Sequence, residues 1–168
     1  MANMPKGNYE DDTYKHFRSQ SRGLGSNLGQ INAYYLLTGN EKSLDNNKYN
    51  KILMNTVGPP PDDMENPHAH HILYKSGNGQ RQKALVEEGQ EILIDYDIDP
   101  IEGPENLCWA PNIAGQHNGD NLQEVVDGIK EAKNNGIDDG DSKEEIREAI
   151  VESLEKSGRK AAKRKRED

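Results

Sequence analysis

Three of the five histidines of this 168-residue chain stand in the run His68-Ala69-His70-His71, just before the apolar pair Ile72-Leu73. A fourth, His117, lies further along the chain between Asn106 and Asn121. Imidazole is a common metal ligand and the usual general base near neutral pH. Adjacent histidines before an apolar run therefore suggest a metal site beside a base, because ordinary core histidines would be scattered more evenly.

The spacing of these residues makes demands on the elements that carry them. His117 and Asn121 are four apart, so on a helix they would lie on one face, about one turn from each other. That suits two ligands, or one ligand and one orienting amide. His70 and His71 would face opposite ways in a regular strand, so the strand must end or bulge there for both to serve one site.

The segments around the histidine pair predict short strands and one helix. Residues 70–74 are expected to form a strand and residues 80–91 a helix, with a turn between them. The apolar run 92–94 is too short to assign to either type. Residues 107–109 predict a second short strand, closed by Pro111.

Two helices are predicted after His117. Apolar residues recur at helical spacing over residues 121–133, and Asn118, Asp120 or Asn121 would cap this helix. Residues 136–140 predict a break. Ser142 and Glu145 then fit a capping box, and a further amphipathic helix follows.

The part of the chain before the histidine run is expected to be an extension. Residues 1–26 have few apolar side chains and predict a loose arm. Residues 28–37 predict a short amphipathic helix, and Leu44 to Val57 a second helical piece that ends at Gly58-Pro59-Pro60-Pro61.

Composition predicts one domain with a small core. Hydrophobic residues make up 32% of the chain, and the mean hydropathy is -1.06, both low for an ordinary globular domain. The single cysteine excludes an intramolecular disulfide framework and a cysteine-based zinc knuckle. Neither a signal peptide near the N-terminus nor a membrane span is expected, because no apolar run approaches the necessary length.

Charge is unevenly distributed along the chain. The net charge is -9, but the last ten residues alone carry +4. An acidic body argues against wide, nonspecific nucleic-acid binding. The basic segment 159–168 has three open interpretations: a nuclear-import signal, a mobile arm that captures nucleic acid without shaping the active site, or a solubilising end.

Three pieces in order resemble the HNH/endonuclease VII superfamily of ββα-metal nucleases, in particular the branch named for an Ala-His-His motif. They are Ala69-His70-His71-Ile72, then Ile98-Asp99-Pro100 through Glu105-Asn106-Leu107-Cys108-Trp109-Ala110-Pro111, then Gly115-Gln116-His117 with Asn121 following. The resemblance covers about residues 66–133. The chain departs from it at Asn118-Gly119-Asp120, where family members often have a proline and an aromatic residue.

The resemblance implies a role for each residue. His70 and His117 would coordinate a metal, with Asn121 as a third ligand unless it serves as the helix cap. His71 would activate water. Asn106 would brace the hairpin loop or orient the base. The implied cofactor is one divalent ion, of which magnesium, manganese, zinc and nickel remain open.

The implied fold is α+β, a small ββα-metal nuclease core with additional N- and C-terminal helices. The expected parts are an N-terminal arm and helical extension (1–61), the nuclease core (62–137), an acidic amphipathic helix (138–158) and a basic tail (159–168).

The implied activity is metal-dependent endonucleolytic cleavage of phosphodiester bonds, with DNA favoured over RNA by the resemblance alone. Three basic residues after the histidine pair would contact substrate phosphates: Lys75, Arg81 and Lys83. Bacterial members of the branch commonly stand at the ends of toxins, which implies an immunity protein as a partner. The alternative is a non-catalytic nucleic-acid or protein interaction module with a structural metal site.

Overall fold

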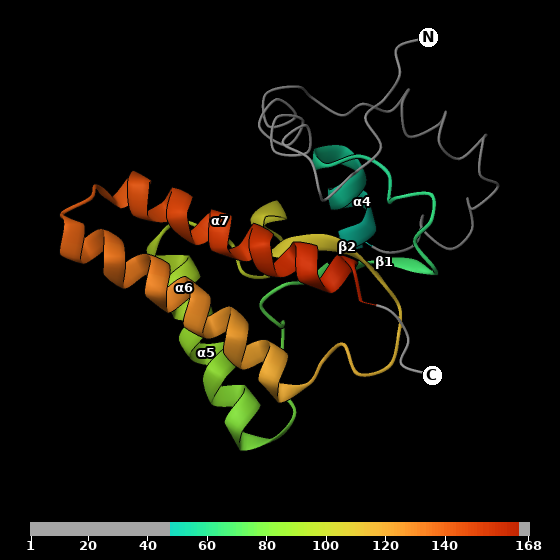
Figure 1. Ribbon diagram of the computed structural model, residues 1–168, viewed down its shortest axis with the longest axis horizontal. Coiled ribbons are helices and arrows are strands. Elements are labelled where there is room, and N and C mark those ends of the chain that lie inside the picture. The colour runs from blue at the N-terminus through green and yellow to red at the C-terminus, as the bar shows by residue number, and fades with distance from the viewer. Residues whose placement is uncertain (1–47, 165–168) are drawn as a thin grey trace, which may run out of the picture.

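The computed structural model describes residues 48–164 (Figure 1). The predicted arm, the predicted helix 28–37, Leu44 and the last four residues lie outside the described residues. The elements, labelled as in Figure 1, are α4 (Lys48–Thr56), β1 (Pro67–His71), α5 (Gly79–Asp95), a 3-10 turn η1 (Pro104–Asn106), β2 (Leu107–Pro111), α6 (Gly119–Asp139) and α7 (Lys143–Ala162).

The two strands pair antiparallel although α5 is inserted between them in the sequence. Ala69 lies opposite Trp109, and His70 lies opposite Cys108. The strand predicted over 70–74 is therefore wrong in position, since β1 begins earlier and ends at His71. Residues 72–74 follow the strand and are buried in the core, which explains why they are as apolar as a strand.

Helix α4 packs on both strands, and its Asn50 side chain reaches the edge of β1 that faces away from β2. The buried Asn50 accepts a hydrogen bond from the backbone N–H of Ala69 through its Oδ1 (2.8 Å). The chain then leaves the helix at Gly58, whose φ of 98° is readily adopted only by glycine. The Gly58 carbonyl accepts a hydrogen bond from the indole of Trp109 (2.9 Å), which connects this turn to β2.

Helix α5 is longer than predicted and includes residues 92–94. Ile92 and Leu93 are buried, while Ile94 is exposed, as helical periodicity requires. Gly89 faces Leu73, and a Cβ at this glycine would stand 2.6 Å from the Leu73 side chain. The helix therefore packs closely on the segment that follows β1.

Helices α6 and α7 form an antiparallel pair joined by a tight turn. α6 continues through the predicted break at 136–140 to Asp139 and ends at Gly140, which has a left-handed φ of 77°. Ser142 and Glu145 form the predicted capping box, with both hydrogen bonds in place. α7 continues to Ala162, so Arg159 and Lys160 belong to a helix and not to a separate tail.

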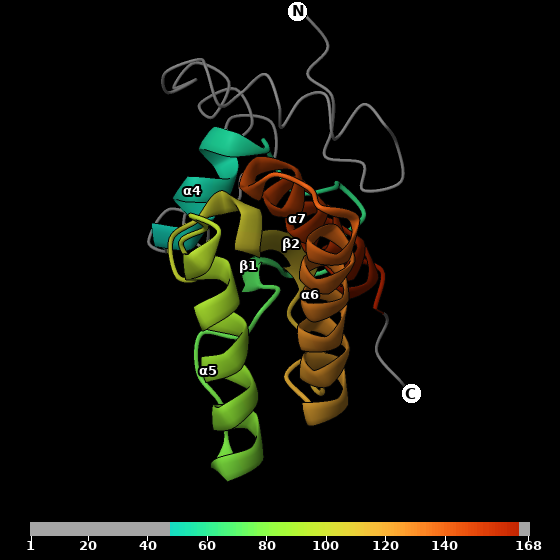
Figure 2. The ribbon, with the colours of Figure 1, turned by 90° about the vertical axis from the view of Figure 1, so that its left-hand side faces the viewer.

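Helix α7 crosses the sheet along β2, while α5 and α6 lie side by side on another part of the molecule (Figures 1 and 2). The approach of α7 is close at Gly158, where a Cβ would stand 3.0 Å from Ile72 and 3.3 Å from Cys108. A core of apolar side chains fills the space between these elements, with Trp109, Leu93, Leu122 and Ile150 completely or almost completely buried.

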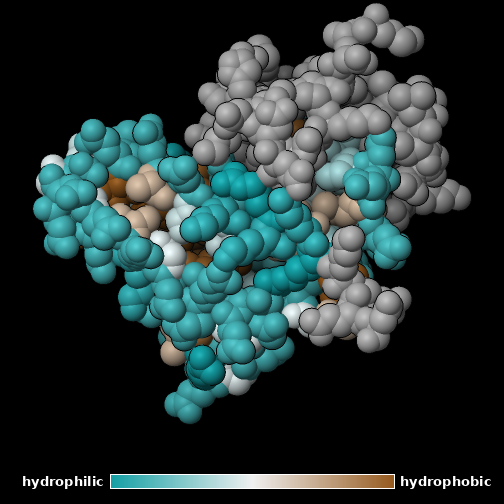
Figure 3. All heavy atoms as spheres, viewed as in Figure 1, coloured by the Kyte–Doolittle hydropathy of each residue, from teal (hydrophilic) through white to brown (hydrophobic). Residues whose placement is uncertain are grey.

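Within residues 48–164, four α-helices and a two-stranded antiparallel sheet confirm the mixed α+β class. The face of the described part seen in Figure 3 is predominantly hydrophilic, in keeping with the polar composition. Among residues 48–164, no helix combines the length and the apolar character that a membrane span requires.

Candidate metal and catalytic site

His70 and His117 face each other although they are distant in the sequence. Their ring centroids are 5.0 Å apart, with the rings inclined at 51°. His70 is only 3% exposed, and its Nδ1 is buried without a hydrogen-bond partner among the described residues. A buried imidazole nitrogen normally has a partner, so this atom is a candidate metal ligand.

His117 reaches this position from a turn and not from a helix. α6 begins only at Gly119, so the predicted helical spacing of His117 and Asn121 is wrong. The hydroxyl of Tyr74 fixes the turn, because its single hydrogen is shared between the carbonyls of Gln116 (2.8 Å) and Asn118 (3.0 Å). The Tyr74 ring lies 5.1 Å from that of His117, so Tyr74 positions the second histidine.

Asn118 is the cap of α6, because its Oδ1 accepts a hydrogen bond from the backbone N–H of Asn121 (2.8 Å). The side chain of Asn121 is therefore not the cap. Its Nδ2 donates to the Gln116 carbonyl (3.2 Å), and the residue lines the same pocket as His70 and Tyr74. It stands near the histidine pair with an amide oxygen that suits a metal.

His71 turns to the other side of β1, as the strand alternation requires. Its Nε2 lies 2.9 Å from the carbonyl oxygen of Ile101, and its ring meets Tyr49 edge-on at 4.6 Å. A carbonyl can only accept, so Nε2 carries the hydrogen of the neutral ring, and Nδ1 keeps a lone pair. The strand ends at this residue, but the two adjacent imidazoles still point in different directions.

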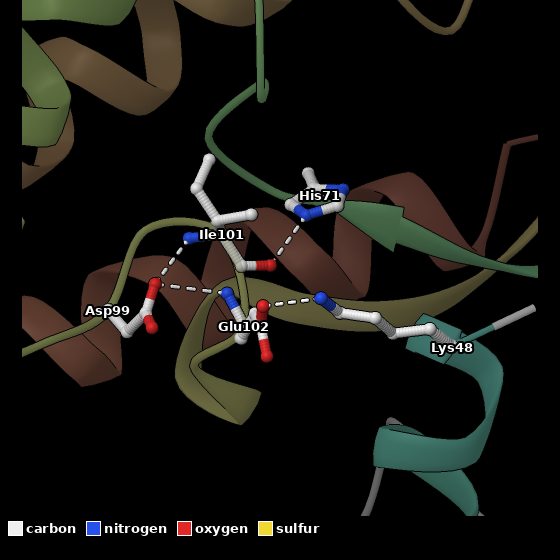
Figure 4. Close-up of polar contacts among 5 residues, drawn as sticks. All are labelled: Lys48, His71, Asp99, Ile101 and Glu102. Carbon is white, nitrogen blue, oxygen red and sulfur yellow. Dashed lines mark hydrogen bonds and ion pairs between the residues drawn. The ribbon is translucent and has the colours of Figure 1, made fainter.

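The loop that holds His71 is itself fixed by a carboxylate (Figure 4). Asp99 Oδ1 accepts hydrogen bonds from the backbone N–H groups of Ile101 (2.8 Å) and Glu102 (3.0 Å). These bonds to Glu102 and Ile101 lower the pKa of Asp99. Lys48 of α4 forms an ion pair with Glu102 on the same loop.

Asn106 lies in the core with no exposed surface. Its side chain accepts from the N–H of Leu73 (2.7 Å) and donates to the carbonyls of Leu73 (2.9 Å) and Pro100 (2.7 Å). It therefore joins the segment after β1 to the loop that contains Ile101. All of these bonds are to backbone groups, so Asn106 acts on His71 through the loop.

Electrostatics keep the imidazoles neutral. Burial, followed by the charges of His117 and His68, lowers the pKa of His70 to about 3. Burial and then the charge of Arg164 lower the pKa of His117. The pKa of His71 is lowered by burial and by Lys75, against the opposite effect of its hydrogen bond to Ile101. Neutral imidazole is the form that binds metals and accepts protons.

The three predicted phosphate-binding residues are not gathered at one place. Lys75 lies with its Nζ 5.4 Å from the Tyr49 ring centroid, on the side of His71. Arg81 and Lys83 are exposed in the first turns of α5 and do not line the pocket beside His70.

Sequence analysis missed three residues around the site. Tyr74 was included in a strand, and its tie to the turn before α6 left no sequence signal. Asp99 belongs to an Asp-Pro turn, which is a recognisable signal for a side chain that fixes a loop. Arg164 lies in the predicted basic tail 159–168, for which three roles stay open, and its guanidinium donates to the Gln116 carbonyl (3.1 Å) beside His117.

The donor set fits a divalent ion in part. Within residues 48–164, no group of three or more His, Cys, Asp or Glu side chains is arranged to hold a metal. Two facing imidazoles and a nearby amide are present, and the orphaned Nδ1 of His70 agrees with a missing ligand. In comparisons with known protein families, curated proteins and solved structures, nothing matched the chain.

Proposed function

We propose that the protein is a metal-dependent endonuclease that hydrolyses phosphodiester bonds, with β1, β2 and α6 as a ββα-metal core. The observation that carries the proposal is the convergence of His70 and His117, with a buried His70 nitrogen that has no partner. DNA is preferred over RNA as substrate on the resemblance alone, as are a toxin context and an immunity partner.

His71 is the general base of the proposed reaction. Its Nε2–H is held by the Ile101 carbonyl, so its Nδ1 lone pair takes the proton from the attacking water. The lowered pKa keeps this nitrogen unprotonated at neutral pH. General-base assistance of this kind typically contributes roughly 10²–10⁴-fold to the rate.

The different directions of His70 and His71 agree with in-line displacement. The attacking water and the leaving oxygen lie on opposite sides of phosphorus in such a reaction. His71 as the base on one side of β1, and the metal ligands on the side of His70, are therefore compatible with a single phosphate bound at the end of the strand. His70 and His117, with Asn121, would hold the ion, which supplies Lewis-acid stabilisation of negative charge on the phosphate oxygens.

The alternative function is a binding module for nucleic acid or protein with a structural metal site. The acidic charge of the chain favours it, because an acidic surface repels phosphate chains. The alternative predicts metal binding and no cleavage.

The test incubates the full chain with plasmid DNA and with structured RNA, each with magnesium, manganese, zinc or nickel. We expect cleavage with at least one ion and none after chelation. His71→Ala should lose nearly all turnover yet bind the ion by calorimetry, whereas His70→Ala should weaken ion binding itself. His16→Ala, outside the motif, is the control. Cleavage that survives exhaustive metal removal would contradict the proposal, and metal loss in His71→Ala but not His70→Ala would invert the assignment.

A further inference from the structure

The C-terminal end of α7 brings positive charge to the histidine pair. Arg164 follows the helix, and its Nη1 donates to the carbonyl of Gln116, the residue before His117 (3.1 Å). In Figure 1, α7 ends near the segment that leaves β2 and leads to α6. Arg164 and Lys160 line one pocket together with His70, Tyr74 and Asn121.

The two basic residues of this pocket differ in how far they are neutralised. Lys160 forms an ion pair with Glu124 of α6, which also lines the pocket. Arg164 has no carboxylate partner within residues 48–164, where its hydrogen bond is to a neutral carbonyl. A guanidinium has five N–H donors in a planar fork, so most of its donors are available to an anion.

The surroundings of Arg164 also fit an anion. Arg164 is close enough for its positive charge to act on His70, His117 and Tyr74. The Arg164 guanidinium would repel a metal ion held by the two imidazoles, unless a negatively charged group lies between them. A phosphate group supplies that charge and matches the bidentate geometry of arginine.

We infer that Arg164 is a substrate-binding residue that holds a backbone phosphate of nucleic acid at the pocket that it lines together with His70. The choice of nucleic acid as the source of the phosphate rests on the proposed function. Arg81 and Lys83, which the sequence predicts to contact phosphates, do not line this pocket.

The test measures binding without cleavage. The full chain is titrated into a fluorescent DNA duplex in the presence of a chelator, and anisotropy gives Kd at several salt concentrations. We expect Arg164→Gln to weaken binding about 10-fold, as for a lost hydrogen bond to a charged group, and to reduce the salt slope by about 0.9, the value for one phosphate contact. The Kd of Arg164→Lys should fall between those of the wild type and Arg164→Gln, because lysine keeps the charge but lacks the planar set of guanidinium donors.

Lys156→Gln is the matched control, since Lys156 is an exposed cation on α7 that does not line the pocket. It should change Kd less than about 2-fold, because an exposed, distant charge is screened. Fluorescence of the single tryptophan, Trp109, confirms that each variant keeps the core. Equal Kd values for Arg164→Gln and Lys156→Gln, or a wild-type chain that does not bind the duplex, would overturn the inference.

Two further outcomes separate the phosphate source from the reaction. Full release of the duplex by millimolar inorganic phosphate at constant ionic strength would overturn the assignment to a nucleic-acid backbone. Binding that depends on Arg164, together with no cleavage under any divalent ion, would support this site and remove the proposed nuclease activity.

Discussion

His70 combines burial with an unpaired ring nitrogen. It is almost completely enclosed, and one of its ring nitrogens has no hydrogen-bond partner among the described residues. A buried polar atom left unsatisfied costs about 1–3 kcal/mol. Such a cost at a residue that also faces His117 is more easily explained by a binding role than by a contribution to stability.

The metal-free protein should lose stability as the pH falls below 6.5. Burial holds the pKa of His70 in the folded state at about 3, whereas the unfolded chain titrates near 6.5. Between these values the unfolded state binds more protons than the folded state. The free energy of unfolding therefore decreases by about 1.4 kcal/mol for each unit by which the pH is lowered. Urea denaturation with a chelator at pH 7.5, 6 and 5 measures this slope.

His70→Gln, which cannot titrate, isolates this contribution. At pH 5 the wild-type protein should have lost about 2 kcal/mol more than the variant, relative to pH 7.5. Parallel pH dependences in the two proteins would show that His70 is not buried in its neutral form.

Asn106 supports two loops at once, so its loss should destabilise the whole domain. Asn106→Leu keeps the size of the side chain and leaves the N–H of Leu73 and the carbonyls of Leu73 and Pro100 without their partner. We expect the free energy of unfolding to fall by about 3 kcal/mol. Asn55→Leu, at an exposed position of α4, should change it by less than about 0.5 kcal/mol. Equal losses in chemical denaturation would contradict the role assigned to Asn106.

Among the elements, those with strong local signals were predicted best. The Ser142 capping box and the apolar face of α7 were both confirmed. The predicted position of β1 was wrong, because Ile72, Leu73 and Tyr74 are buried by tertiary packing after the strand has ended. A short apolar run has the same composition whether it is a buried strand or a buried segment that follows one.

The site was less predictable than the elements. Sequence analysis selected His70, His117 and Asn121, which the structure brings near one another. It could not find Arg164 or Tyr74, because their places depend on how α7 packs on β2 and how the 112–118 segment folds back. Contacts between distant elements leave no periodic signal in the chain.

Gly158 sets the distance between α7 and the sheet. Gly158→Val would place methyl groups where a Cβ alone already stands 3.0 Å from Ile72 and 3.3 Å from Cys108. We expect a loss of about 1–3 kcal/mol in stability and weaker substrate binding, because α7 carries Arg164. Ala149→Val introduces the same side chain at a half-buried position of α7 and should be milder. Thermal melts and DNA titrations of both variants test this, and an undisturbed Gly158→Val would contradict the close packing.

Metal removal distinguishes the proposed endonuclease from a binding module with a structural metal site. The core is built from apolar contacts among all the described helices and both strands. The folded state should therefore persist without metal, as an open catalytic site allows, whereas a structural site would unfold. We expect the chelated protein to melt cooperatively, observed through Trp109, and to gain stability on ion addition by mass action. A chelated chain without a folding transition would favour the structural site.

The bond between Asn50 and Ala69 has a consequence for how copies of the chain behave toward each other. A two-stranded sheet leaves its outer backbone groups ready to pair with a strand from another molecule. α4 occupies that position on β1 with an amide, so the strand cannot easily serve as a template for intermolecular pairing. The hydrogen bond from the short helix before the histidine run therefore occupies one of the outer backbone donors through which β1 would pair with a second copy.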